Sequence, residues 1–139
     1  MPPTKVCTVV ASRPGVMLES LRAALIGTFG IEVVGSAGDG LSTLNLVRER
    51  QPDLLVIDCN LLEEEILALL RQVKEEHTHV CCLVLTQSRR QHVMAIDAGA
   101  DVALSRSCTT RELNIAVTRI RSSLERERGL SIAHENQRN

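Results

Sequence analysis

Three polar residues with different chemistry follow three apolar segments of the chain. Asp58 comes directly after the apolar run 54–57, Thr86 ends the run VCCLVLT, and Arg106 follows DVALS. In open parallel sheets, ligands bind beyond the carboxyl ends of the strands. If these segments are strands of such a sheet, an acid, a hydroxyl and a cation would meet at its functional edge. The alternative is that Asp58 only ends a strand or caps the next helix, where Asp is common, that Thr86 is a strand-end hydroxyl and that Arg106 is a surface arginine.

The apolar segments predict strands of a parallel sheet. The run LLVI at 54–57 is apolar on both faces, which is typical of a parallel strand covered by helices on both sides. Strands are predicted at 5–11, 31–36, 53–58, 80–86 and 101–105. Helical spacing of apolar residues predicts helices at about 18–27, 41–51, 61–76, 89–98 and 110–124.

Five strands that alternate with five helices predict an α/β fold with a doubly wound parallel sheet and right-handed crossovers. The pattern alone does not fix the strand order. A single change of winding direction gives the flavodoxin-like order 2-1-3-4-5, which places the carboxyl ends of strands 5–11 and 53–58 side by side.

Composition indicates one soluble domain. The chain has 139 residues, of which 44% are hydrophobic and 24% are charged. We expect one domain over residues 5–124 and a charged tail over 125–139 that is frayed or disordered.

No apolar run approaches the roughly 20 residues that span a bilayer, and no signal pattern opens the chain, so we expect a cytoplasmic protein with no membrane contact. The net charge of −1 and the absence of a basic stripe predict no nucleic-acid binding by this domain, and the tail is too short for a helix-turn-helix.

The five cysteines predict reduced, buried thiols. Their number is odd and no metal-binding spacing occurs. Adjacent Cys81 and Cys82 should point to opposite faces of a strand. Cys59 follows Asp58 and could be read as a redox sensor, but strand alternation would turn it away from the face of Asp58.

Four stretches carry a resemblance to a known family: IEVVGSAGDG (31–40), PDLLVID (52–58), LVLT ending at Thr86, and GADVALSRSCTTREL (99–113). Over roughly residues 5–124 the chain resembles a response-regulator receiver domain, most closely the NarL/FixJ class that carries a LuxR-type output. The resemblance implies that Asp58 accepts a phosphoryl group from a histidine kinase. Thr86 matches the hydroxyl and Arg106 the cation, usually lysine, that contact the phosphoryl oxygens.

The resemblance also implies Mg²⁺, which screens the charge between a carboxylate and a phosphoryl group. The family carries two acids after its first strand, but Ala11 and Ser12 stand there in this chain. The ligands left are Asp58, the backbone carbonyl of Asn60 and water. No cofactor is firmly predicted, and any Mg²⁺ binding is expected to be weak.

Three further departures concern switching. Ala103 replaces the aromatic residue that reports phosphorylation in family members. The segment between Thr86 and Arg106 is about two residues shorter than usual, and Leu62 replaces a proline.

Two signalling functions remain open. The favoured hypothesis is an atypical pseudo-receiver, a non-enzymatic protein that acts by protein–protein interaction. The alternative is a phosphoaccepting response regulator that is switched at Asp58. An unrelated flavodoxin-like enzyme or cofactor binder is a third class, but no GxGxxG motif, P-loop or nucleophile elbow supports it. The expected partners are a histidine kinase or another signalling protein, with a possible homodimer through the surface of the fourth helix, fifth strand and fifth helix, roughly residues 89–124.

Overall fold

Five parallel strands form one sheet in the computed structural model, which describes residues 5–137 and side chains through residue 127. The strands are β1 (Val6–Ala11), β2 (Ile31–Ala37), β3 (Leu54–Ile57), β4 (Cys81–Thr86) and β5 (Val102–Ser105). The helices are α1 (Val16–Ile26), α2 (Gly40–Arg50), α3 (Glu63–Glu76), α4 (Arg89–Asp97) and α5 (Thr110–Gln137). The order across the sheet is β2-β1-β3-β4-β5. The predicted doubly wound sheet and its order are therefore confirmed.

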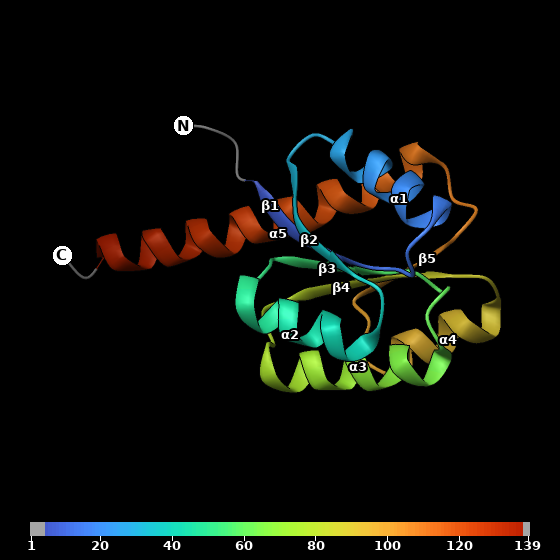
Figure 1. Cartoon of the computed structure of the whole chain (residues 1–139). Coiled ribbons are helices and arrows are strands. Elements are labelled where there is room, and N and C mark those ends of the chain that lie inside the picture. Colours follow the sequence, from blue (N-terminus) through green and yellow to red (C-terminus); the bar gives the residue numbers. More distant parts are fainter. Residues whose placement is uncertain (1–4, 138–139) are drawn as a thin grey trace.

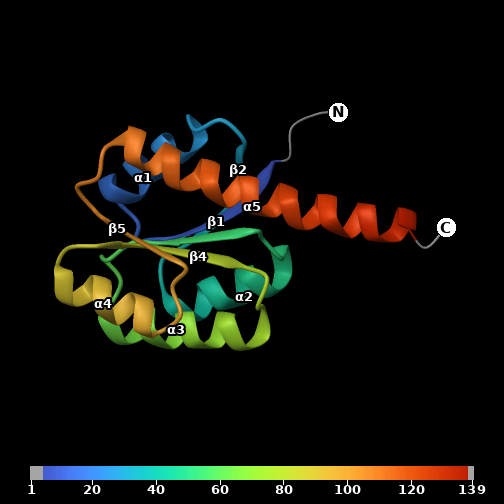
Figure 2. The ribbon, with the colours of Figure 1, turned by 180° about the vertical axis from the view of Figure 1, so that it is seen from behind.

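Helices cover both faces of the sheet. The two views show α1 and α5 on one face and α2, α3 and α4 on the other (Figures 1 and 2). All four side chains of the central strand β3 are buried. Leu55 and Ile57 pack in the core under α2 and α3, and Leu54 and Val56 pack in the core under α1 and α5. Each such burial stabilises the fold by roughly 1.5–3 kcal/mol, which explains why this run is apolar on both faces.

The predicted strand boundaries agree with the structure within about one residue, whereas the last helix is longer than predicted. Gly99 has a φ of 115°, a conformation that favours glycine, and it follows α4 as expected. Helix α5 continues to Gln137 and extends past the sheet (Figure 1), where the sequence predicts a frayed tail from residue 125. Its apolar stripe ends near Leu124, but Glu and Arg are good helix formers and no proline interrupts them. Residues 138 and 139 lie outside the described residues, and fraying of the tail in solution stays a prediction.

The cysteines follow the alternation of β4. Cys81 packs against the core under α1 and α5, whereas Cys82 belongs to the core under α2 and α3, so the prediction of opposite faces is confirmed. Cys82 is buried and the other four cysteines are half-buried, so the prediction of buried thiols is right in full only for Cys82. Burial raises the pKa of the Cys81 thiol to about 11 and that of Cys82 to about 12, which makes both poor nucleophiles at neutral pH.

No helix within residues 5–137 is both long enough and apolar enough to cross a membrane.

Candidate functional site

The carboxyl ends of β1, β3, β4 and β5 bring the predicted site residues to one edge of the sheet. The amide of Asp58 donates to the carbonyl of Ala11 at 2.8 Å, which fixes the end of β3 beside that of β1. The amide of Arg106 donates to the carbonyl of Thr86 at 2.7 Å, which fixes the end of β5 beside that of β4. Short loops follow each strand, so side chains from four loops can share this edge.

The carboxylate of Asp58 is almost fully buried, with 2% of the residue exposed. The hydroxyl of Ser12 donates to Asp58 Oδ2 at 3.1 Å. Arg106 Nε lies 3.6 Å from Asp58 Oδ1, which is ion-pair distance but too long for a good hydrogen bond. A buried carboxylate is costly unless it is paired, so Ser12 and Arg106 supply the compensation that Asp58 requires.

Ser12 also connects Asp58 to Asn60. The amide nitrogen of the Asn60 side chain donates to Ser12 Oγ at 3.0 Å. The single hydroxyl hydrogen of Ser12 can point either to Asp58 Oδ2 at 3.1 Å or to Asn60 Oδ1 at 3.3 Å. The carboxylate is the stronger acceptor because it is charged. Ser12 therefore passes a hydrogen bond from Asn60 to Asp58 at the position where the sequence resemblance places an acid.

Arg13 is a member of this network that the sequence did not predict. Its backbone amide donates to Asn60 Oδ1 at 3.1 Å, and its Nε donates to the backbone carbonyl of Asn60 at 2.8 Å. The side chain is exposed, but both bonds fix it against the loop after β3. Its place two residues after strand β1 was the available signal, because the loops after β1 and β3 are neighbours in this fold.

Thr86 and Ala103 occupy the neighbouring strands. Thr86 is buried, and its hydroxyl donates to the carbonyl of Leu104 at 3.3 Å, toward β5. Ala103 is half-buried in β5 and pairs with Val84 of β4. A methyl group at this position fills little space and has no alternative rotamer, so it cannot report a movement of Thr86 by its own reorientation.

Cys59 points toward Asp58, contrary to the prediction that it turns away. Its thiol donates to Asp58 Oδ1 at 3.5 Å. Strand β3 ends at Ile57, so the strict alternation of a strand no longer applies at Cys59. Burial and then the charge of Asp58 raise the pKa of the Cys59 thiol, which is the opposite of what an activated redox cysteine requires.

An ion pair fixes the start of α4 beside the start of α3. Arg90 donates from two nitrogens to the two carboxylate oxygens of Glu63, at 2.9 and 3.1 Å. This bidentate geometry lowers the pKa of Glu63. The ion pair connects α4 to α3 next to the edge that carries Asp58 and Thr86.

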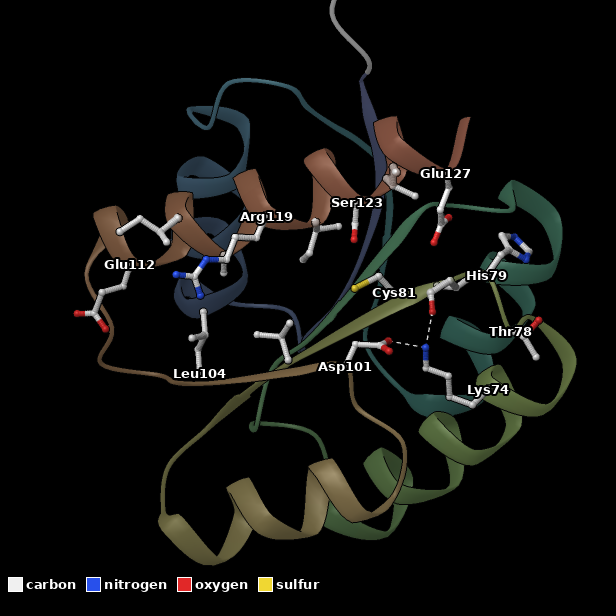
Figure 3. A pocket seen from close by; sticks show the side chains of 16 residues that line it. Lys74, Thr78, His79, Cys81, Asp101, Leu104, Glu112, Arg119, Ser123 and Glu127 are labelled. Carbon is white, nitrogen blue, oxygen red and sulfur yellow. Dashed lines mark hydrogen bonds and ion pairs between the residues drawn. The ribbon is translucent and has the colours of Figure 1, made fainter. Parts of the chain in front are cut away.

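A separate groove of about 630 Å³ runs along α5 and the amino ends of β4 and β5 (Figure 3). In Figure 3, Lys74 forms an ion pair with Asp101 and also donates to the carbonyl of Val80. Cys81 and Ser123 border the same space. The α5 and β5 side of this groove belongs to the surface for which the sequence predicts partner contacts, whereas Lys74 and residues 78–81 lie outside that surface.

The strand order and the acid, hydroxyl and cation at the strand ends define a flavodoxin-like receiver fold. The family model for the response regulator receiver domain matches residues 14–118. The chain therefore belongs to the response regulator receiver domain family, a family of two-component signalling.

Two curated relatives and one solved structure illustrate the similarity. Response regulator MprA of Mycobacterium leprae (strain TN) is 36% identical over 110 residues, which cover 78% of this chain and 46% of the relative. YhcZ of Bacillus subtilis (strain 168), an uncharacterized transcriptional regulatory protein, is 32% identical over 94 residues, which cover 66% of this chain and 44% of the relative. This chain thus spans less than half the length of either relative. The receiver domain of the response regulator NarL from Mycobacterium tuberculosis has the same fold, with a TM-score of 0.77 at 24% identity over 86% of this chain and 98% of that one.

The residues at the edge do not fit the Mg²⁺ site that the family implies. Mg²⁺ requires oxygen ligands in near-octahedral geometry, usually including carboxylates. Asp58 is the buried carboxylate at the end of β3, and it already interacts with Ser12 and Arg106. The carbonyl of Asn60 is occupied by Arg13. Within the described residues, no group of three or more His, Cys, Asp or Glu side chains could hold a metal ion.

Proposed function

We propose that this chain is a pseudo-receiver, a signalling protein that acts through protein contacts with weak or no Mg²⁺-dependent phosphorylation of Asp58. One observation carries the proposal. The buried Asp58 carboxylate has internal partners in Ser12 and Arg106, so it does not need a metal ion to be stable. A cytoplasmic location is part of the proposal, because response regulators typically act there.

The same contacts argue against a strong phosphorylation switch. A ligand shifts a conformational equilibrium only by the difference in its affinity for the two states. A phosphoryl group on Asp58 would first have to displace the pairing with Arg106 and the bond from Ser12. Thr86 is bonded to β5, and Ala103 offers no ring that could follow a movement of Thr86.

The surface of α4, β5 and α5 supports a function through partners. Val93 and Ile96 on α4 and Ile115 on α5 are large apolar side chains with between 42% and 50% of their surface exposed. These side chains come from two elements of the surface for which the sequence predicts partner contacts, and the apolar area that they expose is available to a protein partner. Response regulators interact with histidine kinases, so a histidine kinase is one candidate partner. The other candidates are a different signalling protein and a second copy of this chain. The prediction that the domain itself does not bind nucleic acid remains part of the proposal.

A phosphoaccepting response regulator is the second candidate. It is favoured by the retention of Asp58, Thr86 and a cation, Arg106, at one edge of the sheet. Under this alternative, Arg106 would leave Asp58 and contact the phosphoryl oxygens.

Intact-mass spectrometry after treatment with acetyl phosphate distinguishes the two candidates. The chain is incubated with and without Mg²⁺, and Asp58→Asn serves as the control. The pseudo-receiver predicts little or no added phosphoryl mass and no increase with Mg²⁺. A stoichiometric, Mg²⁺-dependent adduct that disappears in Asp58→Asn would establish the phosphoaccepting alternative.

A further inference from the structure

Arg13 binds the backbone oxygen that the receiver family offers to a divalent cation. Its Nε donates to the carbonyl of Asn60 at 2.8 Å, and its backbone amide donates to the Asn60 side-chain oxygen at 3.1 Å. The first bond places the guanidinium on the carbonyl oxygen, and the second holds the backbone of Arg13 beside the same residue. Ser12 meanwhile donates a hydrogen bond to Asp58, and Arg106 lies at ion-pair distance from it. The two metal-ligand positions of the family therefore each face an arginine in this chain. Arg13 contacts the Asn60 carbonyl, and Arg106 lies beside the Asp58 carboxylate.

We propose that Arg13 takes the place of the divalent cation in this pocket and excludes metal ions from the Asn60 carbonyl. The inference rests on the proposed pseudo-receiver function and deepens it. The loss of acids at Ala11 and Ser12 removes attraction for a metal ion, whereas Arg13 adds active exclusion.

Charge and occupancy both contribute to the exclusion. A Mg²⁺ ion bound to the Asn60 carbonyl at about 2.1 Å would lie within about 5 Å of Arg13 Nε, because Nε is 2.8 Å from the same oxygen, and the ion would share that oxygen with the hydrogen bond from Arg13. Repulsion between a divalent ion and a guanidinium at this separation weakens metal binding by roughly tenfold even in a water-like dielectric. Lysine at this position would keep the charge but lose the planar guanidinium that donates to Asn60.

Manganese binding to the full chain tests the proposal. Free Mn²⁺ is measured by electron paramagnetic resonance in titrations of the wild type, Arg13→Ala, Arg13→Gln and Arg13→Lys. Arg50→Ala is the matched control, because Arg50 is exposed and ends α2, at the opposite end of the helix from the loops of the site. We expect Arg13→Ala to raise Mn²⁺ affinity by roughly tenfold, Arg13→Lys to raise it less, and Arg50→Ala to leave it nearly unchanged.

Two additional measurements keep the result specific. Broadening of amide NMR signals by Mn²⁺ should centre on Asp58 and Asn60 in Arg13→Ala, and adding Asp58→Asn should remove the gain. Arg13 is exposed, so its variants should unfold at nearly the wild-type temperature. If Arg13→Ala fails to fold, Arg13→Gln tests the charge contribution alone, since it removes the positive charge while its amide can still donate to Asn60; a Mn²⁺ affinity equal to that of the wild type would then overturn the role of the Arg13 charge.

The outcomes separate this inference from the proposed function. Weak binding that is equal in the wild type and Arg13→Ala would overturn the role of Arg13 and leave the pseudo-receiver in place. Equal gains in Arg13→Ala and Arg50→Ala would overturn it as well, because a general charge effect would then suffice. Saturation of the wild type at low millimolar Mn²⁺ would instead contradict the proposed function itself.

Discussion

Replacing Arg106 with methionine should destabilise the fold, because it leaves the buried Asp58 carboxylate without its cation. Only 2% of the Asp58 side chain and 23% of the Arg106 side chain are exposed, and the two charged groups lie 3.6 Å apart. Coulomb's law gives an attraction of roughly 1 to 5 kcal/mol at this distance for effective dielectric constants between 80 and 20. Partial exposure of Arg106 and the lack of a short hydrogen bond place the expected coupling near the lower end, at about 1–2 kcal/mol.

A double-mutant cycle measures this coupling. Urea unfolding of the wild type, Arg106→Met, Asp58→Asn and the double variant gives four free energies of unfolding. We expect Arg106→Met alone to cost about 2 kcal/mol and to cost clearly less when Asp58 is already Asn, because an unpaired buried charge is then absent. The coupling should persist at high salt, since buried pairs are weakly screened. A coupling below about 0.5 kcal/mol, or a stabilising Arg106→Met, would refute the pairing.

Three further outcomes follow from individual contacts. Cys59 should react with iodoacetamide more slowly than a free cysteine near neutral pH, because its pKa is raised; peptide mapping that finds it faster would contradict this. The hydrogen bond from Arg48 lowers the pKa of Glu76 from 4.5 to about 2, so this pair stabilises the fold above the unfolded-state value and the contribution is lost as the pH falls toward 2. Urea midpoints should therefore fall less steeply below about pH 4.5 in Glu76→Gln than in the wild type, and parallel profiles would speak against the pair. Arg90→Ala should accelerate amide hydrogen exchange in α4 by removing the ion pair with Glu63, and unchanged exchange would show that this ion pair does not restrain the helix.

The sequence was sufficient to predict the strands of the sheet, because apolar runs of strand length indicate which segments are buried. The run at 54–57 had to be covered on both faces, and the short loops between strands and helices left few possible topologies. Asp58 follows the central strand, so its place at the functional edge was a direct consequence of the fold. A single change of winding direction gave the strand order, and the resemblance to the family then supplied the roles of Thr86 and Arg106.

The contacts of the pocket could not be predicted in the same way. The interaction of Arg13 with Asn60 joins residues 47 positions apart and depends on the conformation of two loops. The direction of the Cys59 thiol depends on where β3 ends, because the strand ends at Ile57 and its alternation does not extend to Cys59. The extent of α5 was missed because an apolar stripe reports which face of a helix is buried, whereas charged residues can continue a helix after burial ends.

NMR titration with Mg²⁺ followed by beryllofluoride tests the central claim most directly. The claim is that Ser12 and Arg106 stabilise the Asp58 carboxylate without a metal ion, and that a phosphoryl group on Asp58 does not change the conformation of the domain. It predicts no saturation at low millimolar Mg²⁺ and small amide shifts confined to the loops around Asp58. Saturation at low millimolar Mg²⁺, with large beryllofluoride shifts that spread from Thr86 into α4, would contradict the claim and establish a phosphorylation switch.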